Sequence, residues 1–109
     1  MKNVQIPYQW VLLKLPNNFY KIFAIWQGGY LKDFNWRINS GIKSVEQNED
    51  YYFFCGYSGS IYKCKKESYG IGLLEANLLL NKIIRETNIQ LIKQKEVEKV
   101  ITQNFCYEQ

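Results

Sequence analysis

The sequence lacks histidine altogether, and it contains only one methionine and two prolines. Histidine is the commonest general base in enzymes and the commonest metal ligand, so its absence removes both roles at once. A phosphate-binding glycine loop is also missing, because Gly70 and Gly72 supply only a G-x-G fragment. The sequence therefore predicts no catalytic residue, no metal site and no cofactor.

Long apolar runs are missing as well. Val11, Leu12 and Leu13 are followed at once by Lys14, and no stretch approaches the roughly 20 apolar residues that span a bilayer. The first 30 residues contain no apolar segment typical of an export signal. We expect a cytoplasmic protein that does not enter a membrane. Its three cysteines should then be free thiols in a reducing compartment.

Hydrophobic and aromatic residues are abundant. They make up 47% and 17% of the 109 residues, which excludes a disordered chain and favours β-strands. The length suits one domain, residues 1–109. The formal net charge of +4 is uneven, since residues 1–45 contain six basic side chains and one acid. This modest excess permits an acidic partner without requiring one.

The pattern predicts an α+β fold with an antiparallel sheet of about four to six strands in residues 8–66. Residues 8–15 and 19–26 are aromatic and branched, and Pro16–Asn18 between them reads as a hairpin turn. The second run is apolar on both alternating faces, so this strand should be central or covered on each side. Residues 27–41 form a long aromatic loop with a short strand around Trp36, and residues 42–46 could be a connecting strand.

A second hairpin is predicted from residues 51–57 and 60–66, which flank Ser58–Gly59. A turn of two or four residues would pair Phe53 with Cys64 on the core face and Phe54 with Lys63 on the surface face. Cys55 and Cys64 would then be diagonal neighbours about 7–8 Å apart, which is long for a disulfide. A change of one residue in the turn would put the two cysteines on opposite faces.

Two helices should follow, at about 71–87 and 94–105, and pack against the sheet. In the first helix one apolar stripe contains Leu73, Ala76, Leu80, Ile83 and Ile84, with Leu79 at its margin, whereas Leu74 and Leu78 lie off it. In the second, Val97, Val100, Ile101 and Phe105 should face inward. Residues 89–92 could form a short edge strand. The two off-stripe leucines leave a homodimer open.

The favoured function is a small non-catalytic regulatory protein that binds a still unknown protein partner. Aromatic residues and arginine dominate binding hot spots. By analogy of size and composition alone, such chains occur among inhibitors and accessory proteins of viruses and mobile elements. The candidate binding residues come from the aromatic loop and from the tip of the second hairpin: Tyr30, Phe34, Trp36, Arg37, Tyr57, Ser58 and Ser60.

Two alternatives remain open. Tyr52, Phe54, Lys63 and Lys65 could share a basic aromatic sheet face that binds single-stranded nucleic acid, with bases stacked on the rings and phosphates met by lysines. The other alternative is an enzyme that uses a cysteine or serine nucleophile. It has least support, because no histidine is present to activate Cys55, Cys64, Ser58 or Ser60.

Overall fold

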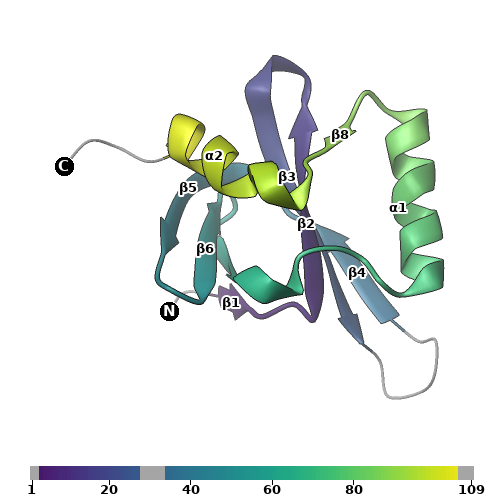
Figure 1. Cartoon of the computed structure of the whole chain (residues 1–109), viewed down its shortest axis with the longest axis horizontal. Coiled ribbons are helices and arrows are strands. Elements are labelled where there is room, and N and C mark those ends of the chain that lie inside the picture. Colours follow the sequence, from purple (N-terminus) through teal and green to yellow (C-terminus); the bar gives the residue numbers. More distant parts are fainter. Residues whose placement is uncertain (1–2, 28–33, 106–109) are drawn as a thin grey trace.

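A computed structural model describes residues 3–27 and 34–105 of the chain (Figure 1). It confirms the α+β class, with helices at the C-terminal end. The strands are divided between two four-stranded sheets, where the sequence predicted one. Sheet A has the order β1 (Asn3–Gln5), β7 (Ser60–Lys65), β6 (Tyr51–Gly56) and β5 (Ile42–Gln47). Sheet B has the order β4 (Phe34–Ile38), β3 (Phe19–Gln27), β2 (Gln9–Leu15) and β8 (Gln90–Leu91).

Sheet B is the middle layer of the molecule. The helix α1 (Leu74–Glu86) covers one of its faces, and sheet A together with α2 (Gln94–Phe105) covers the other. Alternate residues of β2 and β3 therefore enter two separate cores. Trp10, Leu12 and Ile22 pack towards sheet A, whereas Val11 and Phe23 pack towards α1. This arrangement confirms the prediction that the second aromatic run is a central strand covered on both faces.

The first hairpin forms as predicted. Leu15 pairs with Phe19 across the three-residue turn Pro16–Asn18. Asn17 and Asn18 adopt positive φ angles of 69° and 57° in this turn. Asparagine tolerates that conformation better than most residues, and this explains why a turn without glycine can reverse the chain here.

The second hairpin has a different register from the predicted one. Tyr52 pairs with Cys64, and Phe54 pairs with Tyr62, because the turn contains three residues (57–59). The shift of one residue exchanges the two faces of the hairpin. Tyr52 and Phe54 are consequently buried in the core between the sheets, where Phe53 was expected. Phe53 instead lies half-buried on the outer face of sheet A, beside Lys63.

The same register decides where the cysteines lie. Cys64 is buried in the core, and Cys55 is half-buried on the outer face of sheet A. Both are free thiols. They therefore lie on opposite faces, as the sequence predicted for a turn changed by one residue.

We expect a thiol reagent to separate these two cysteines. Cys55 should alkylate in the native protein at least about tenfold faster than Cys64, which reacts only after local or global opening. Burial also raises the pKa of the Cys64 thiol, so less of it is thiolate. Peptide mass spectrometry after timed iodoacetamide labelling measures both rates. Equal labelling of the two residues in the folded protein would contradict the observed register.

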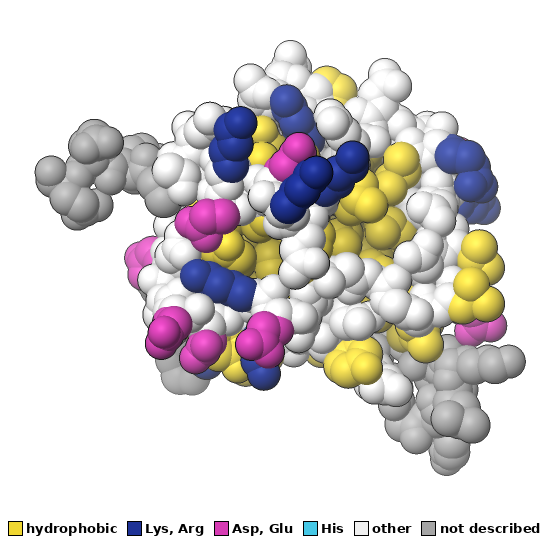
Figure 2. Space-filling model, viewed as in Figure 1, with side chains coloured by type: hydrophobic (Ala, Val, Ile, Leu, Met, Phe, Trp, Pro, Cys, Tyr) yellow, Lys and Arg dark blue, Asp and Glu magenta, His cyan; other side chains and the backbone are white. Residues whose placement is uncertain are grey.

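The helices match the predicted apolar stripes. Ala76 and Leu80 of α1 and Val97 and Ile101 of α2 are buried. Leu74 and Leu78 are 69% and 58% exposed, so they lie off the buried stripe of α1 as predicted. Figure 2 shows further hydrophobic surface between α2 and α1, a region that includes the partly exposed strand β8.

Among the described residues, no helix combines the length and apolar character that crossing a membrane would require.

Candidate binding cleft

Two hollows share Arg37 as a lining residue, one beside β1, β3 and β4 and the other between the end of β4 and the β6–β7 turn. We call them together the Arg37 cleft. The first hollow has a volume of about 340 Å³ and is lined by Gln5, Trp26, Asn35, Trp36 and Arg37. The second has a volume of about 270 Å³, and its polar lining residues are Arg37, Asn39, Ser40, Ser58, Ser60 and Tyr62. Segments that lie about twenty residues apart in the sequence therefore form one surface feature.

Asn39 is fixed in this cleft by the end of the β3–β4 ladder. Its backbone N–H donates to the Ile22 carbonyl at 3.1 Å, and its side-chain Oδ1 accepts a hydrogen bond from the Ile22 N–H at 2.9 Å. The side chain thus extends the strand pairing by one step beyond Ile38. Asn39 is only 6% exposed, and its Nδ2 has no hydrogen-bond partner.

The residues after β4 are tied to the β6–β7 turn by hydrogen bonds. The Ser58 N–H donates to Ser40 Oγ at 2.9 Å, and the Tyr57 N–H donates to the Gly41 carbonyl at 3.1 Å. Gly56 permits this close approach, since a Cβ at that position would lie 3.3 Å from Ser40 Oγ. These contacts hold both sides of the second hollow in one arrangement.

Arg37 is the one charged residue among those that line the two hollows. Its position can be judged from Tyr62, whose pKa is raised mainly by burial, while the positive charge of Arg37 opposes that rise. The positive charge of the guanidinium group therefore lies close enough to Tyr62, a buried lining residue of the second hollow, to influence its hydroxyl. No carboxylate among the lining residues neutralises it.

The structure brings together some of the predicted binding residues and separates others. Arg37, Ser58 and Ser60 line the second hollow, and Trp36 lines the first. Trp36 is 46% exposed, with its ring stacked on Phe23 at 5.8 Å between centroids. Tyr57 is 60% exposed and stacks on Phe19, outside both hollows.

Phe34 does not line the cleft. Phe34 is half-buried against the core between sheet B and α1, and Tyr30 lies outside the described residues. Sequence reasoning missed Asn39 and Ser40, because within the loop predicted at residues 27–41 only the aromatic residues and Arg37 were selected as binding candidates. A polar residue directly after a strand and next to a glycine turn was the one available signal.

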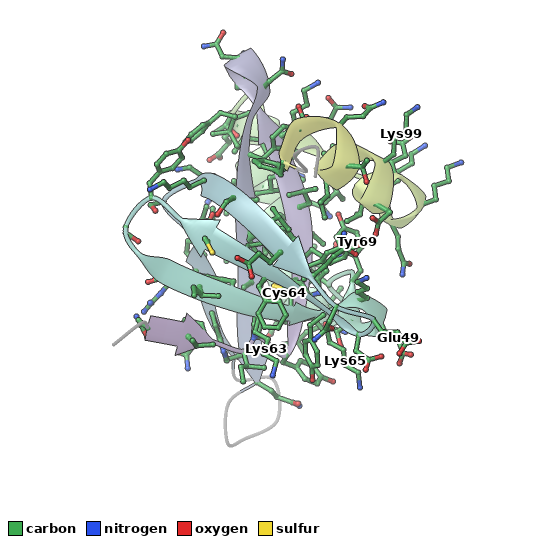
Figure 3. The ribbon with its side chains drawn as sticks, turned by 90° about the vertical axis from the view of Figure 1, so that its left-hand side faces the viewer. Glu49, Lys63, Cys64, Lys65, Tyr69 and Lys99 are labelled. Atoms are coloured by element: carbon green, nitrogen blue, oxygen red, sulfur yellow. The ribbon has the colours of Figure 1, made fainter. Side chains whose placement is uncertain are left out.

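The prediction of a nucleic-acid-binding face is wrong for its two aromatic residues. Tyr52 and Phe54 are buried between the sheets, on the side opposite to Lys63 and Lys65. Two different rings, Tyr51 and Phe53, share the outer face with these lysines. Lys63 Nζ lies 4.5 Å from the centroid of the Tyr51 ring. Figure 3 views sheet A from this side, and no described helix covers the face.

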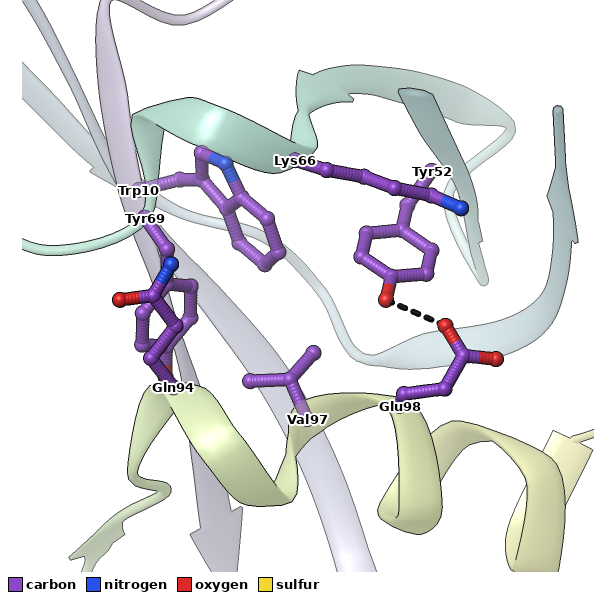
Figure 4. A pocket seen from close by; sticks show the side chains of 7 residues that line it. All are labelled: Trp10, Tyr52, Lys66, Tyr69, Gln94, Val97 and Glu98. Atoms are coloured by element: carbon purple, nitrogen blue, oxygen red, sulfur yellow. Dashed lines mark hydrogen bonds between the residues drawn. The ribbon is translucent and has the colours of Figure 1, made fainter. Parts of the chain in front are cut away.

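A smaller hollow of about 200 Å³ lies where α2 meets sheet A (Figure 4). Three of its polar residues, Tyr52, Lys66 and Glu98, are linked by hydrogen bonds, partly through the neighbouring Gln47. The Tyr52 hydroxyl donates to Glu98 at 2.7 Å, Gln47 Nε2 donates to Glu98 at 3.2 Å, and Lys66 Nζ donates to Gln47 Oε1 at 2.7 Å. Lys66 Nζ also lies 4.7 Å from the centroid of the Tyr52 ring. We interpret this network as the attachment of α2 to sheet A.

The network predicts a pH dependence of stability. The hydrogen bond from Tyr52 lowers the pKa of Glu98 below its usual 4.5. A carboxyl with a lower pKa in the folded state stabilises the fold above its unfolded pKa, and this contribution disappears as pH falls through the folded pKa. The free energy of unfolding of wild type should exceed that of Glu98→Gln at pH 7, and the difference should vanish in acid. Urea titrations at several pH values measure it. A difference that stays constant with pH would contradict this prediction.

The chain was compared with protein-family models, with curated proteins and with solved structures, and no match was found. Within the described residues, no group of three or more Cys, Asp or Glu side chains is placed to hold a metal ion. The functional proposal below therefore rests on the geometry of the chain itself.

Proposed function

We propose that this chain is a non-catalytic binding protein that regulates a protein partner, as an inhibitor or accessory subunit. The partner would contact the Arg37 cleft and two exposed rings near it, Tyr57 beside the second hollow and Trp36 on the α1 side of the edge strand β4. Tryptophan, tyrosine and arginine are the residue types that contribute most to protein–protein binding energy.

One observation carries this proposal. Trp36 and Arg37 on β4 and Ser58 and Ser60 at the β6–β7 turn line adjoining hollows that share Arg37 as a common wall. Protein interfaces typically combine a large aromatic anchor with polar groups that recognise a specific partner atom. The polar lining of the second hollow supplies the specific contacts. The ring of Trp36 stacks on Phe23, on the α1 side of the edge strand β4, and offers an aromatic contact next to the hollows.

The states of Cys64, Ser40 and Ser60 also support a role without catalysis. Cysteine reacts as a nucleophile through its thiolate, and burial shifts Cys64 towards the neutral thiol. Ser40 Oγ accepts the Ser58 N–H, and Ser60 Oγ accepts a weak 3.4 Å bond from Asn3 Nδ2. Neither hydroxyl donates its proton to a base in these contacts, which is the interaction that activates a serine.

Affinity capture from the native cell tests the proposal. Wild type, Arg37→Gln and Lys82→Gln should be compared as baits at equal loading, with captured proteins quantified by mass spectrometry. Lys82 is an exposed residue of α1, on the other side of sheet B, so this variant controls for the loss of one positive charge. We expect one partner whose recovery falls at least about tenfold with Arg37→Gln, the effect of losing one charge-assisted contact. Equal recovery by all three baits would overturn the proposal.

Single-stranded nucleic-acid binding is the second candidate, and a specific observation favours it. The outer face of sheet A carries Tyr51 and Phe53 beside Lys63, whose Nζ lies within 6 Å of both ring centroids, at 4.5 and 5.9 Å. Rings and cations in such an arrangement can stack bases and contact phosphates. Glu46 lies across from Phe53 on the same face and weakens the positive charge there.

Filter binding of single-stranded oligonucleotides at two salt concentrations examines this candidate. Binding through phosphates should weaken steeply as salt rises, and Phe53→Ala should weaken it further. Trp36→Ala is the aromatic control, because Trp36 lies on sheet B. A lack of detectable binding at low salt would remove the nucleic-acid function.

A further inference from the structure

We propose that the second hollow of the Arg37 cleft is a binding site for a phosphate group. This inference rests on the proposed function, because it names the chemical group that the cleft recognises. The phosphate would be carried either by a phosphorylated side chain of the partner or by a small phosphate-containing molecule. Both sources present the same oxygen atoms to the cleft.

The charge of the hollow suits an anion. Arg37 is positive, and the remaining lining residues are neutral. An arginine guanidinium offers up to five N–H donors in a planar fork that fits two phosphate oxygens. No carboxylate in the lining competes for this fork, and the guanidinium N–H groups that do not interact with the Tyr62 hydroxyl are available to a ligand. The hollow also contains more donors than one carboxylate ligand would use, and this favours phosphate, with its three strongly accepting oxygens.

Asn39 provides the second, independent observation. Its Oδ1 is held by the Ile22 N–H, so the amide group is locked in one orientation and its Nδ2 is left without a partner. Leaving a buried donor unpaired costs roughly 1–3 kcal/mol, and proteins seldom retain such groups without a reason. This nitrogen has less than 1 Å² of accessible surface, so a ligand oxygen in the hollow reaches it only when neighbouring side chains move. We infer that such a movement on binding pairs the Asn39 amide with the phosphate.

The hydroxyls of Ser40 and Ser60 can also donate hydrogen bonds to an anion in this hollow. Ser40 Oγ already accepts the Ser58 N–H, and Ser60 Oγ accepts Asn3 Nδ2. A serine hydroxyl has one proton to donate. With an acceptor position of each oxygen already in use, these hydroxyls remain able to donate to an anion. Arg37, Asn39, Ser40 and Ser60 thus offer donors to one hollow from β4, the residues that follow it and β7.

Titration of the ¹⁵N-labelled full chain with inorganic phosphate at constant ionic strength tests the site. The side-chain Nδ2 protons of Asn39 and the backbone amide of Ser58 should shift along a saturable curve. Acetate at equal concentration should shift them less. Arg37→Gln should weaken phosphate binding at least about tenfold, whereas Lys82→Gln should leave it unchanged. Absence of a saturable shift, or the same affinity in Arg37→Gln and wild type, would overturn the phosphate site.

Two further variants keep the test informative if Arg37→Gln is poorly folded. Ser60→Ala removes one hydroxyl donor and should weaken phosphate binding while the amide spectrum elsewhere stays unchanged. Asn39→Asp retains the oxygen that accepts from Ile22 and replaces the free donor by an acceptor, so it should abolish the shift at Ser58. If both variants bind phosphate as wild type does, the proposal is wrong.

A separate arm identifies the source of the phosphate and separates this inference from the proposed function. Capture of the partner is repeated from a lysate treated with phosphatase. Loss of capture assigns the phosphate to the partner, and unchanged capture together with a positive titration assigns it to a small molecule. Capture that depends on Arg37 without any response to phosphate would overturn the phosphate site and leave the protein-binding function intact.

Discussion

Replacing Trp10 by alanine is expected to lower the free energy of unfolding by about 3–5 kcal/mol, a large part of the stability of a small domain. Trp10 is fully buried, and its ring packs against Tyr52, Phe54 and Tyr69 at centroid distances of 4.7–5.8 Å. Its Nε1 also donates to the Lys65 carbonyl at 2.8 Å. The substitution removes the contacts of Trp10 with sheet A, leaves those of Leu12 in place, and leaves the Lys65 carbonyl without this donor.

Trp36→Ala is the matched control for this experiment. Trp36 is 46% exposed, and its stacking on Phe23 should contribute only about 0.5–1.5 kcal/mol. Urea denaturation followed by circular dichroism measures both variants without depending on tryptophan fluorescence. If Trp36→Ala destabilised the protein as much as Trp10→Ala, the assignment of Trp10 to the core between the sheets would be contradicted.

Replacing Gly41 by alanine is expected to cost about 2–4 kcal/mol, from backbone strain and overpacking together. Gly41 has a φ of 124°, which residues with a Cβ rarely adopt. A Cβ at this position would lie 2.4 Å from the Cζ atom of Phe19. The Phe19 ring would have to move, and with it the stacked ring of Tyr57. Gly41→Ala should therefore weaken binding at the cleft as well as stability.

Gly59→Ala separates the free-energy cost of backbone strain from the cost of a steric clash with Phe19. Gly59 also has a positive φ, of 95°, but nothing lies within 4 Å of the position that its Cβ would occupy. This variant should lose only the strain contribution, roughly 1–2 kcal/mol. Thermal unfolding of both variants gives the comparison. A loss at Gly59 equal to the loss at Gly41 would show that contact with Phe19 contributes nothing.

Much of the fold could be predicted from periodicity. The strand at Phe19–Gln27 is apolar on both faces, and this pattern required cover on each side. The stripes that contain Ala76 and Leu80, and Val97 and Ile101, indicated which helix faces would be buried. These features follow from the repeat of side chains along one element, so they need no knowledge of the partners of that element.

The division into two sheets and the register of the second hairpin could not be predicted in the same way. Both depend on pairings between distant segments. β1 joins β7 in parallel, and β8 joins β2 from a position almost eighty residues away. The register depended on whether the turn after Gly56 has two, three or four residues. Residues 51–54 are all aromatic, so both faces of the strand were acceptable to a hydrophobic core.

The candidate cleft was predicted only in part. Arg37, Ser58 and Ser60 were selected by residue type and by their position in loops, and the structure places them around one hollow. Asn39 was not predicted because its role depends on a contact with a distant part of the chain. Its Oδ1 is bonded to Ile22, 17 residues earlier in the chain, and its amide nitrogen is buried without a partner. No local pattern in the sequence indicates a contact between residues so far apart.

Site-specific photo-crosslinking in the native cell tests the binding surface most directly. A photoreactive phenylalanine analogue is placed at Tyr57 in one variant and at Leu78 in another, two positions that are 60% and 58% exposed. Tyr57 lies between Gly56 and Ser58, which line the second hollow of the Arg37 cleft, and Leu78 lies on α1, beyond sheet B. We predict a covalent adduct with one partner from position 57 and none with that partner from position 78. Crosslinking of that partner from position 78 and not from position 57 would contradict the proposed binding surface.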